Sequence, residues 1–164
     1  MANLGAVLID SYENAGSVSS IVLNGMNSSY KFYELYALIS PSGANNRIRL
    51  QESGTSNTSA IYGRRLYFTN ARYGSGHNVD DNDTSFRIQH YQGGAINIHL
   101  QIFNSQVSST HTQLVQRAQG QYGGYSQANL GALNFQNNSS IDGIEFFEGG
   151  GANLNGYFYL YGYK

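Results

Sequence analysis

The sequence has no cysteine among its 164 residues, and this absence excludes several kinds of protein. Without a thiol there are no disulfide bonds, no thiolate ligands for a metal and no cysteine nucleophile for catalysis. The folded chain must therefore be held together by side-chain packing and by hydrogen bonds of the backbone.

Charge is also scarce, since Asp, Glu, Lys and Arg make up 12% of the residues and the formal net charge is -1. Such a chain has no positive field that attracts a phosphate backbone, so we expect no nucleic-acid partner. No apolar run approaches the length that crosses a bilayer, and residues 1–5 show no positively charged start of a secretory signal. We therefore expect a soluble protein made in a cytoplasm, with no membrane partner.

Glycine and aromatic residues are plentiful, with 20 Gly, 14 Tyr and 8 Phe, whereas proline occurs once. Runs rich in aromatic and β-branched residues alternate with clusters of Gly, Asn, Ser and Asp, which favour tight turns. This pattern predicts strands at residues 5–11, 17–23, 30–40, 47–52, 59–69, 84–91, 95–103, 112–120, 127–135, 141–147 and 156–163. Disorder is expected only in the first few residues and in a loop from about 73 to 83.

Strands with such short connections pair antiparallel, and they must stack or close into a barrel to bury their apolar faces. We predict an all-β fold, a two-sheet antiparallel β-sandwich that forms one domain over residues 1–164. Alternation along residues 95–103 supports it, because Ile98 and Leu100 share one face and His99 lies on the other. Residues 30–40 are apolar on both faces, which predicts a central strand covered on both sides, with a neighbouring subunit as one candidate cover.

Two aromatic runs, at residues 141–148 and 157–164, flank a glycine-rich stretch, and this pattern predicts a β-hairpin whose second strand lies inside a sheet. In the second run Phe158 and Leu160 face one side and the tyrosines face the other. These are Tyr157, Tyr159, Tyr161 and Tyr163. Their rings are apolar and their hydroxyls need partners, so the row suits contact with a protein or a sugar. Packing beneath neighbouring loops is the alternative interpretation.

No group of residues stands out as a catalytic or metal site. The cluster Asp80-Asp81-Asn82-Asp83 offers oxygen ligands of the kind that calcium prefers, but it lacks EF-hand spacing, and a solvated turn is the simpler interpretation. The histidines are widely spaced, and there is no Gly-x-Ser-x-Gly motif. A pair of catalytic carboxylates would require distant glutamates to meet, among Glu34, Glu52, Glu145 and Glu148. We predict no catalytic residue, no metal and no cofactor.

Residues 141–146 are Ile-Asp-Gly-Ile-Glu-Phe, Asn153-Leu154 follow in the connection, and residues 156–162 are Gly-Tyr-Phe-Tyr-Leu-Tyr-Gly. This segment resembles the closing motif of a group of small virion proteins of tailed bacteriophages, which ends a jelly-roll-like β domain. The run Tyr30-Lys31-Phe32-Tyr33-Glu34-Leu35 is similar to an early strand of that group. The glycine-rich stretch departs from the group's usual Ser-Ser-Gly-Asn turn.

The resemblance implies a non-enzymatic, jelly-roll-like virion protein, often a homotrimer. We expect a head decoration (cement) protein that binds itself and the major capsid protein, because a chain running from Met1 to its closing strand leaves little room for a fibre shaft. Tyr157, Tyr159 and Tyr161 are then expected in a subunit or partner contact. The alternative is a tail-fibre or tail-tip protein that binds glycans through loop aromatics. The candidates for that role are Tyr62, Tyr73 and Tyr125. A free-standing cellular lectin is a third hypothesis.

Overall fold

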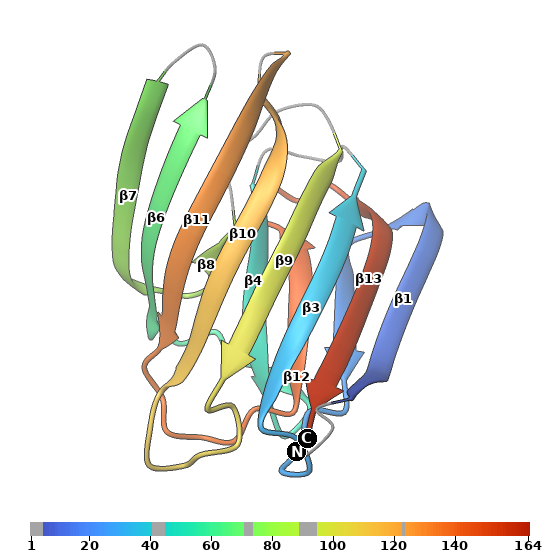
Figure 1. The fold of residues 1–164 in the computed structure, drawn as a ribbon, viewed down its shortest axis with the longest axis vertical. Coiled ribbons are helices and arrows are strands. Elements are labelled where there is room, and N and C mark those ends of the chain that lie inside the picture. Colours follow the sequence, from blue (N-terminus) through green and yellow to red (C-terminus); the bar gives the residue numbers. More distant parts are fainter. Residues whose placement is uncertain (1–4, 41–44, 71–73, 89–94, 123) are drawn as a thin grey trace.

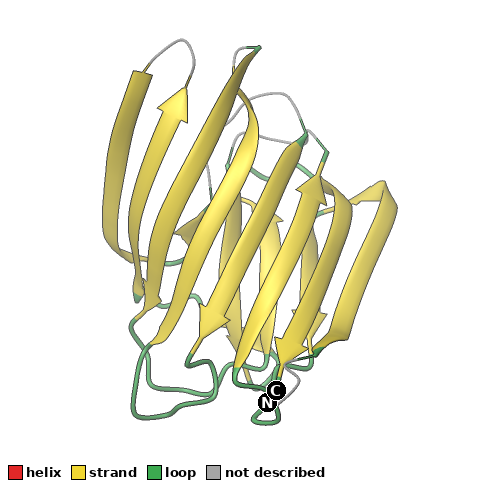
Figure 2. Ribbon diagram, in the orientation of Figure 1, coloured by secondary structure: helices red, strands yellow, loops and turns green. Residues whose placement is uncertain are grey.

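The computed structural model describes residues 5–40, 45–70, 74–88, 95–122 and 124–164. These residues form thirteen β-strands and no helix (Figure 1; Figure 2). The paired strands are antiparallel, so the all-β antiparallel fold expected from the sequence is confirmed. Of the strand expected at 84–91, only Phe86–Arg87 pairs, and residues 89–91 lie outside the described part of the chain. No helix in this described part is able to cross a membrane.

The strands form two sheets. The larger comprises β1 (Ala6–Val18), β3 (Phe32–Ile39), β6 (Tyr62–Asn70), β7 (Gly74–Asp83), β9 (Ile96–Phe103), β10 (Thr112–Tyr122), β11 (Tyr125–Phe135) and β13 (Leu154–Tyr163). The smaller comprises β2 (Ser20–Asn24), β4 (Asn46–Glu52), β5 (Thr55–Ser56), β8 (Phe86–Arg87) and β12 (Gly143–Glu148). The larger sheet has the order β1-β13-β3-β9-β10-β11-β6-β7, and the smaller has the order β2-β12-β4-β5 with β8 also paired to β4.

The chain crosses repeatedly between the two sheets, which lie one behind the other in Figure 1. It alternates between them from β1 to β4, and it returns to the smaller sheet at β8 and β12. Repeated crossing of this kind is typical of jelly-roll-like sandwiches, and here it is combined with the meander β9-β10-β11.

Apolar side chains from both sheets meet in a core between them. In β9, Ile98 and Leu100 are buried and Asn97 is exposed. In β13, Phe158 is fully buried, whereas its neighbour Tyr157 is 48% exposed. The faces predicted for these two strands are confirmed, because side chains alternate with period two whatever the partner strands are.

The strand predicted to be central is central, since β3 lies between β13 and β9. Tyr33 and Leu35 point into the core and are fully buried, whereas Tyr36 and Leu38 on the other face are exposed. Within this chain, therefore, the smaller sheet covers only one of the two apolar faces of β3.

The C-terminal hairpin expected from the sequence is wrong, although its second strand does lie inside a sheet. β12 pairs with β2 and β4 in the smaller sheet, whereas β13 pairs with β1 and β3 in the larger one. The glycine-rich connection at 149–153 therefore carries the chain across the sandwich. Phe146 of β12 and Phe158 of β13 meet in the core with their ring centroids 5.0 Å apart. The crossing buries both rings from opposite sides, which a local hairpin would not do.

The segment expected to be a loop from about 73 to 83 forms β7 at an edge of the larger sheet, residue 73 itself lying outside the described residues. The acidic cluster therefore lies in a strand and not in a turn. Its carboxylates pair with arginines: Asp80 with Arg64, Asp81 with Arg65 at 3.0 Å, and Asp83 with Arg47 at 3.3 Å. Charged side chains on an edge strand also oppose pairing with strands of other chains.

Candidate functional site

The larger sheet packs one face on the smaller sheet, and its opposite face, called here the outer face, is open. Directly paired residues of an antiparallel sheet point to the same face, so the register identifies the side chains that lie on it. One row across the strands consists of Tyr159, Tyr36, His99, Arg117, Leu130, Tyr67 and His77. The adjacent row consists of Tyr157, Leu38, Asn97, Gln119, Ala128 and Thr69.

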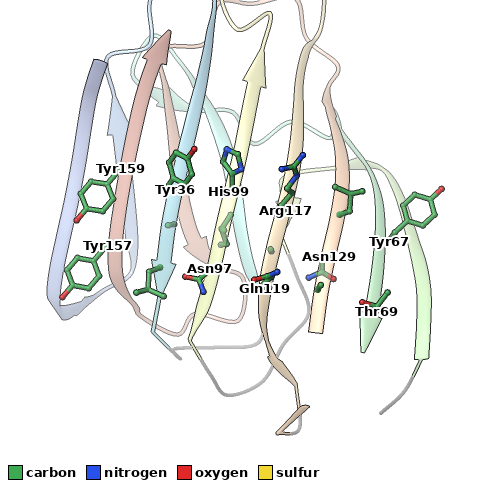
Figure 3. Close-up of a pocket in the computed structure, with 16 residues that line it drawn as sticks. Tyr36, Tyr67, Thr69, Asn97, His99, Arg117, Gln119, Asn129, Tyr157 and Tyr159 are labelled. Carbon is green, nitrogen blue, oxygen red and sulfur yellow. The ribbon is translucent and has the colours of Figure 1, made fainter. Parts of the chain in front are cut away.

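A groove of about 590 Å³ runs along these two rows and crosses the strands from β13 to β6. Five strand spacings separate its ends, which corresponds to a length of about 24 Å. Figure 3 shows Tyr157 and Tyr159 at one end and Tyr67 at the other, with the polar side chains between them. The groove is thus an elongated, open site built on regular strands, which hold side chains more rigidly than loops do.

Tyrosine rings supply the apolar surfaces of the groove. Tyr36 stacks on His99 with the ring centroids 4.5 Å apart and the planes 4° from parallel. Tyr157 and Tyr67 expose 48% and 64% of their surface. Because an aromatic ring offers a flat apolar face beside a polar hydroxyl, such rings suit ligands that are themselves both apolar and hydroxylated. Thr69, Asn97 and Gln119 add neutral hydrogen-bonding groups.

The position of Tyr36 is fixed by a hydrogen-bond cluster around Glu34 beside the groove. Glu34 accepts hydrogen bonds from the hydroxyls of Tyr36 at 2.9 Å and Tyr163 at 2.5 Å and from the amide of Gln101 at 3.0 Å. Burial alone would raise the pKa of Glu34, but the hydrogen bonds outweigh it and lower that pKa. The same bond raises the pKa of Tyr163 to about 12. Glu34 is therefore an ionised acceptor near neutral pH, and its lone pairs are engaged.

The groove itself is free of carboxylates among the described residues that line it, and Arg117 is the one Lys or Arg among them. The nearby acidic groups are engaged by residues of the groove: Glu34 by the hydroxyl of Tyr36, with His99 Nε2 at 3.4 Å, and Glu13 by the hydroxyl of Tyr159 at 2.7 Å. This hydrogen bond is also the main cause of the raised pKa of Tyr159. Among the described residues of the lining, Arg117 is thus the one Lys or Arg that faces the groove.

The tyrosines expected in a subunit or partner contact all point to the outer face. Tyr157 and Tyr159 line the groove, whereas Tyr161 lies beside it with its ring edge toward Tyr36, at 6.0 Å between centroids. No loop among the described residues covers this row. The interpretation that these rings pack beneath loops is therefore not supported.

Of the three aromatic residues named for glycan binding, the two that the structure describes, Tyr62 and Tyr125, are not brought together. Tyr62 is wrong as a surface residue, because it is the first residue of β6, its side chain is 1% exposed, and its hydroxyl is bonded to Leu50 and Asn57. Tyr73 lies outside the described residues. Tyr125 begins β11 and is exposed, but it does not line the groove.

Other candidate groups stay apart as well. Glu34 lies on the larger sheet, whereas Glu52, Glu145 and Glu148 belong to β4 and β12 of the smaller one. Glu145 pairs with Arg49, and Glu148 is buried and accepts backbone N–H groups. Among the described residues, no three His, Cys, Asp or Glu side chains gather closely enough to hold a metal ion.

Sequence reasoning missed most of the groove: Tyr36, Asn97, His99, Arg117 and Gln119. Each occupies an outward position of an alternating strand, so the sequence pattern predicts on which face of the sheet its side chain lies. What the pattern does not give is the strand order, which brings these side chains side by side. No protein-family model matches the chain, and no curated protein sequence matches it significantly.

Proposed function

We propose that the chain is a non-enzymatic virion protein of a tailed bacteriophage that binds a glycan receptor through the groove of the larger sheet. The bacteriophage assignment depends on the resemblance of the C-terminal segment. Glycan binding is supported by one observation, the groove that combines tyrosine rings with neutral amide and hydroxyl groups over about 24 Å. Sugars have an apolar ring face and a rim of hydroxyls, and this lining matches both.

A glycan array probed with the purified protein tests this proposal. We expect binding to a limited set of glycans, and we expect Tyr36→Ala to weaken it by about tenfold, because a stacking surface worth about 1.4 kcal/mol is removed. Tyr125→Ala is the matched control, since the two rings are 42% and 40% exposed but only Tyr36 lines the groove. The proposal fails if no glycan binds, or if Tyr125→Ala is the more damaging change.

Head decoration is the second candidate, and the size of the outer face favours it. Large apolar side chains that remain exposed gather there, namely Leu8, Tyr36, Leu38, Tyr67, Val79, Leu130 and Tyr157. The eight strands span a face on the order of 900 Å² by their spacing and rise, close to the roughly 800 Å² that each partner contributes to a stable interface. A second copy of the chain or a capsid protein fits such a face.

Light scattering after size-exclusion chromatography, together with co-sedimentation with empty phage heads, tests this second candidate. Tyr161→Ala is the informative variant, because Tyr161 lies on the outer face but outside the groove lining. If the face is a protein contact, this variant weakens trimer formation or head binding by about tenfold or more. A wild-type protein that stays monomeric and does not co-sediment with phage heads rules out the decoration function.

A further inference from the structure

We infer that the groove takes an acidic oligosaccharide and that Arg117 binds the carboxylate of one of its sugars. This inference rests on the proposed glycan-binding function and adds the class of glycan. The observation that carries it is a guanidinium that faces the groove and forms no ion pair with any described residue, in a lining that has no carboxylate among its described residues.

Of the five other arginines that the structure describes, four contact an acidic residue; the fifth, Arg87, makes no ion pair with a described residue but lies on β8 of the smaller sheet, outside the groove. Arg47 and Arg65 lie 3.3 and 3.0 Å from aspartate oxygens, and Arg49 lies 3.7 Å from Glu145. Arg64 is buried and contacts Asp80. The guanidinium of Arg117, by contrast, makes no ion pair or hydrogen bond with any residue that the structure describes. An unpaired cation in a concave site attracts an anionic ligand group.

The position of Arg117 places that anion inside the groove rather than at its rim. Arg117 lies on β10, opposite His99 of β9 and Leu130 of β11. It is three strands from Tyr159 and two strands from Tyr67, or about 14 and 10 Å by the strand spacing. A sugar bound over Arg117 thus has neighbours that reach the tyrosine rings at both ends (Figure 3).

The chemistry of the side chain favours a carboxylate. A guanidinium presents parallel N–H donors in a plane and so binds both oxygens of a carboxylate at once. Asn97 and Gln119, which are paired across β9 and β10 in the adjacent row, offer amide donors and acceptors for the hydroxyls of the same chain of sugars. Uronic and sialic acids carry the carboxylate on a sugar ring, which lets one ligand satisfy Arg117, the amides and the tyrosines.

The test compares binding of two pairs of probes by calorimetry: tetragalacturonic acid with a neutral tetrasaccharide, and sialyllactose with lactose. We expect the acidic member of at least one pair to bind at least about tenfold more tightly, since hydrogen bonds to charged groups exceed neutral ones by about that factor. Arg117→Gln should abolish this preference, so that the acidic member binds no more tightly than the neutral one. Arg65→Gln is the matched control, because it removes a charge from the same face that is already paired with Asp81. It should keep the preference.

The outcomes separate this inference from the proposed function. Equal binding of acidic and neutral probes, or a preference that survives Arg117→Gln, overturns the acidic-glycan assignment and leaves glycan binding standing. Loss of the preference in Arg65→Gln as well assigns it to the general charge of the face and also overturns the role of Arg117. If the wild-type protein binds none of these probes and no glycan on the array, both ideas fail together.

Discussion

Replacing Phe158 with alanine is expected to lower the free energy of unfolding by about 3–5 kcal/mol, the usual cost of removing a buried phenylalanine ring. Phe158 is fully buried on β13, and its ring meets Phe146 of the smaller sheet at 5.0 Å between centroids. The substitution leaves a cavity between the two sheets that neighbouring side chains fill only in part. Equilibrium unfolding in urea, followed by circular dichroism, measures the effect.

Tyr157→Ala is the matched control, because Tyr157 precedes Phe158 on the same strand and points to the outer face. It should cost about 1 kcal/mol or less, as is usual for exposed positions. The double variant Phe146→Ala/Phe158→Ala should lose less unfolding free energy than the sum of the losses in the two single variants, since each single change already removes the contact between the rings. Equal losses for Phe158→Ala and Tyr157→Ala would contradict the assignment of the two faces.

The second large effect is expected at Gly156, where β13 passes close to β3. A Cβ atom at this position would lie 2.1 Å from the carbonyl oxygen of Leu38 and 3.0 Å from the Cα of Ile39, and the residue has a φ of 153°. These contacts are with backbone, which cannot rotate aside as a side chain can. We expect Gly156→Ala to destabilise the protein by about 3 kcal/mol or more, which lowers the melting temperature by about 6–12 °C for a chain of this size.

Gly151→Ala separates the steric contribution from the conformational one. Gly151 also has a positive φ, 84°, but no atom lies within 4 Å of a Cβ built there. This variant should therefore show only the cost of the backbone conformation, about 1–2 kcal/mol. Thermal unfolding of the two variants side by side checks the difference, and a Gly156→Ala protein as stable as Gly151→Ala would show that β13 and β3 are less closely apposed.

Alternation along single strands was predictable, and partner choice was not. The inward faces of β9 and β13 follow from the period of two alone, and so does the outward face that carries His99 and Tyr157. The groove requires more, because Tyr67 and Tyr157 lie far apart in the sequence and come to opposite ends of one site only through the order of the intervening strands. No local signal in the sequence encodes that order.

The errors at the C-terminus and at β7 have a common physical cause. Two aromatic runs around a glycine-rich stretch are compatible with a hairpin and with a sheet crossing, and long-range contacts such as the packing of Phe146 on Phe158 distinguish the two. Similarly, β7 has few apolar side chains, and ion pairs of Asp80 and Asp81 with Arg64 and Arg65 help to hold β7 against β6. Both contacts join different strands, so composition within a window could not reveal them.

The inward position of Tyr62 follows from the alternation of side chains along β6. Tyr62 shares its parity on β6 with Arg64 and Leu66, both of which are buried, so its ring had to turn inward with them. An aromatic residue at the start of a strand is thus a candidate for ligand stacking only if its parity matches the open face.

Because β13 lies between β1 and β3, the larger sheet closes late when the chain leaves the ribosome. β1 and β3 emerge first; β1 then lacks its partner in the sheet, and β3 lacks the partner of one edge, until residues 154–163 follow. Insertion of β13 between β1 and β3 links positions more than a hundred residues apart, which makes this pairing a slow step. During that interval the nascent chain exposes open strand edges, so we expect its folding yield to depend on chaperones and on low temperature during expression.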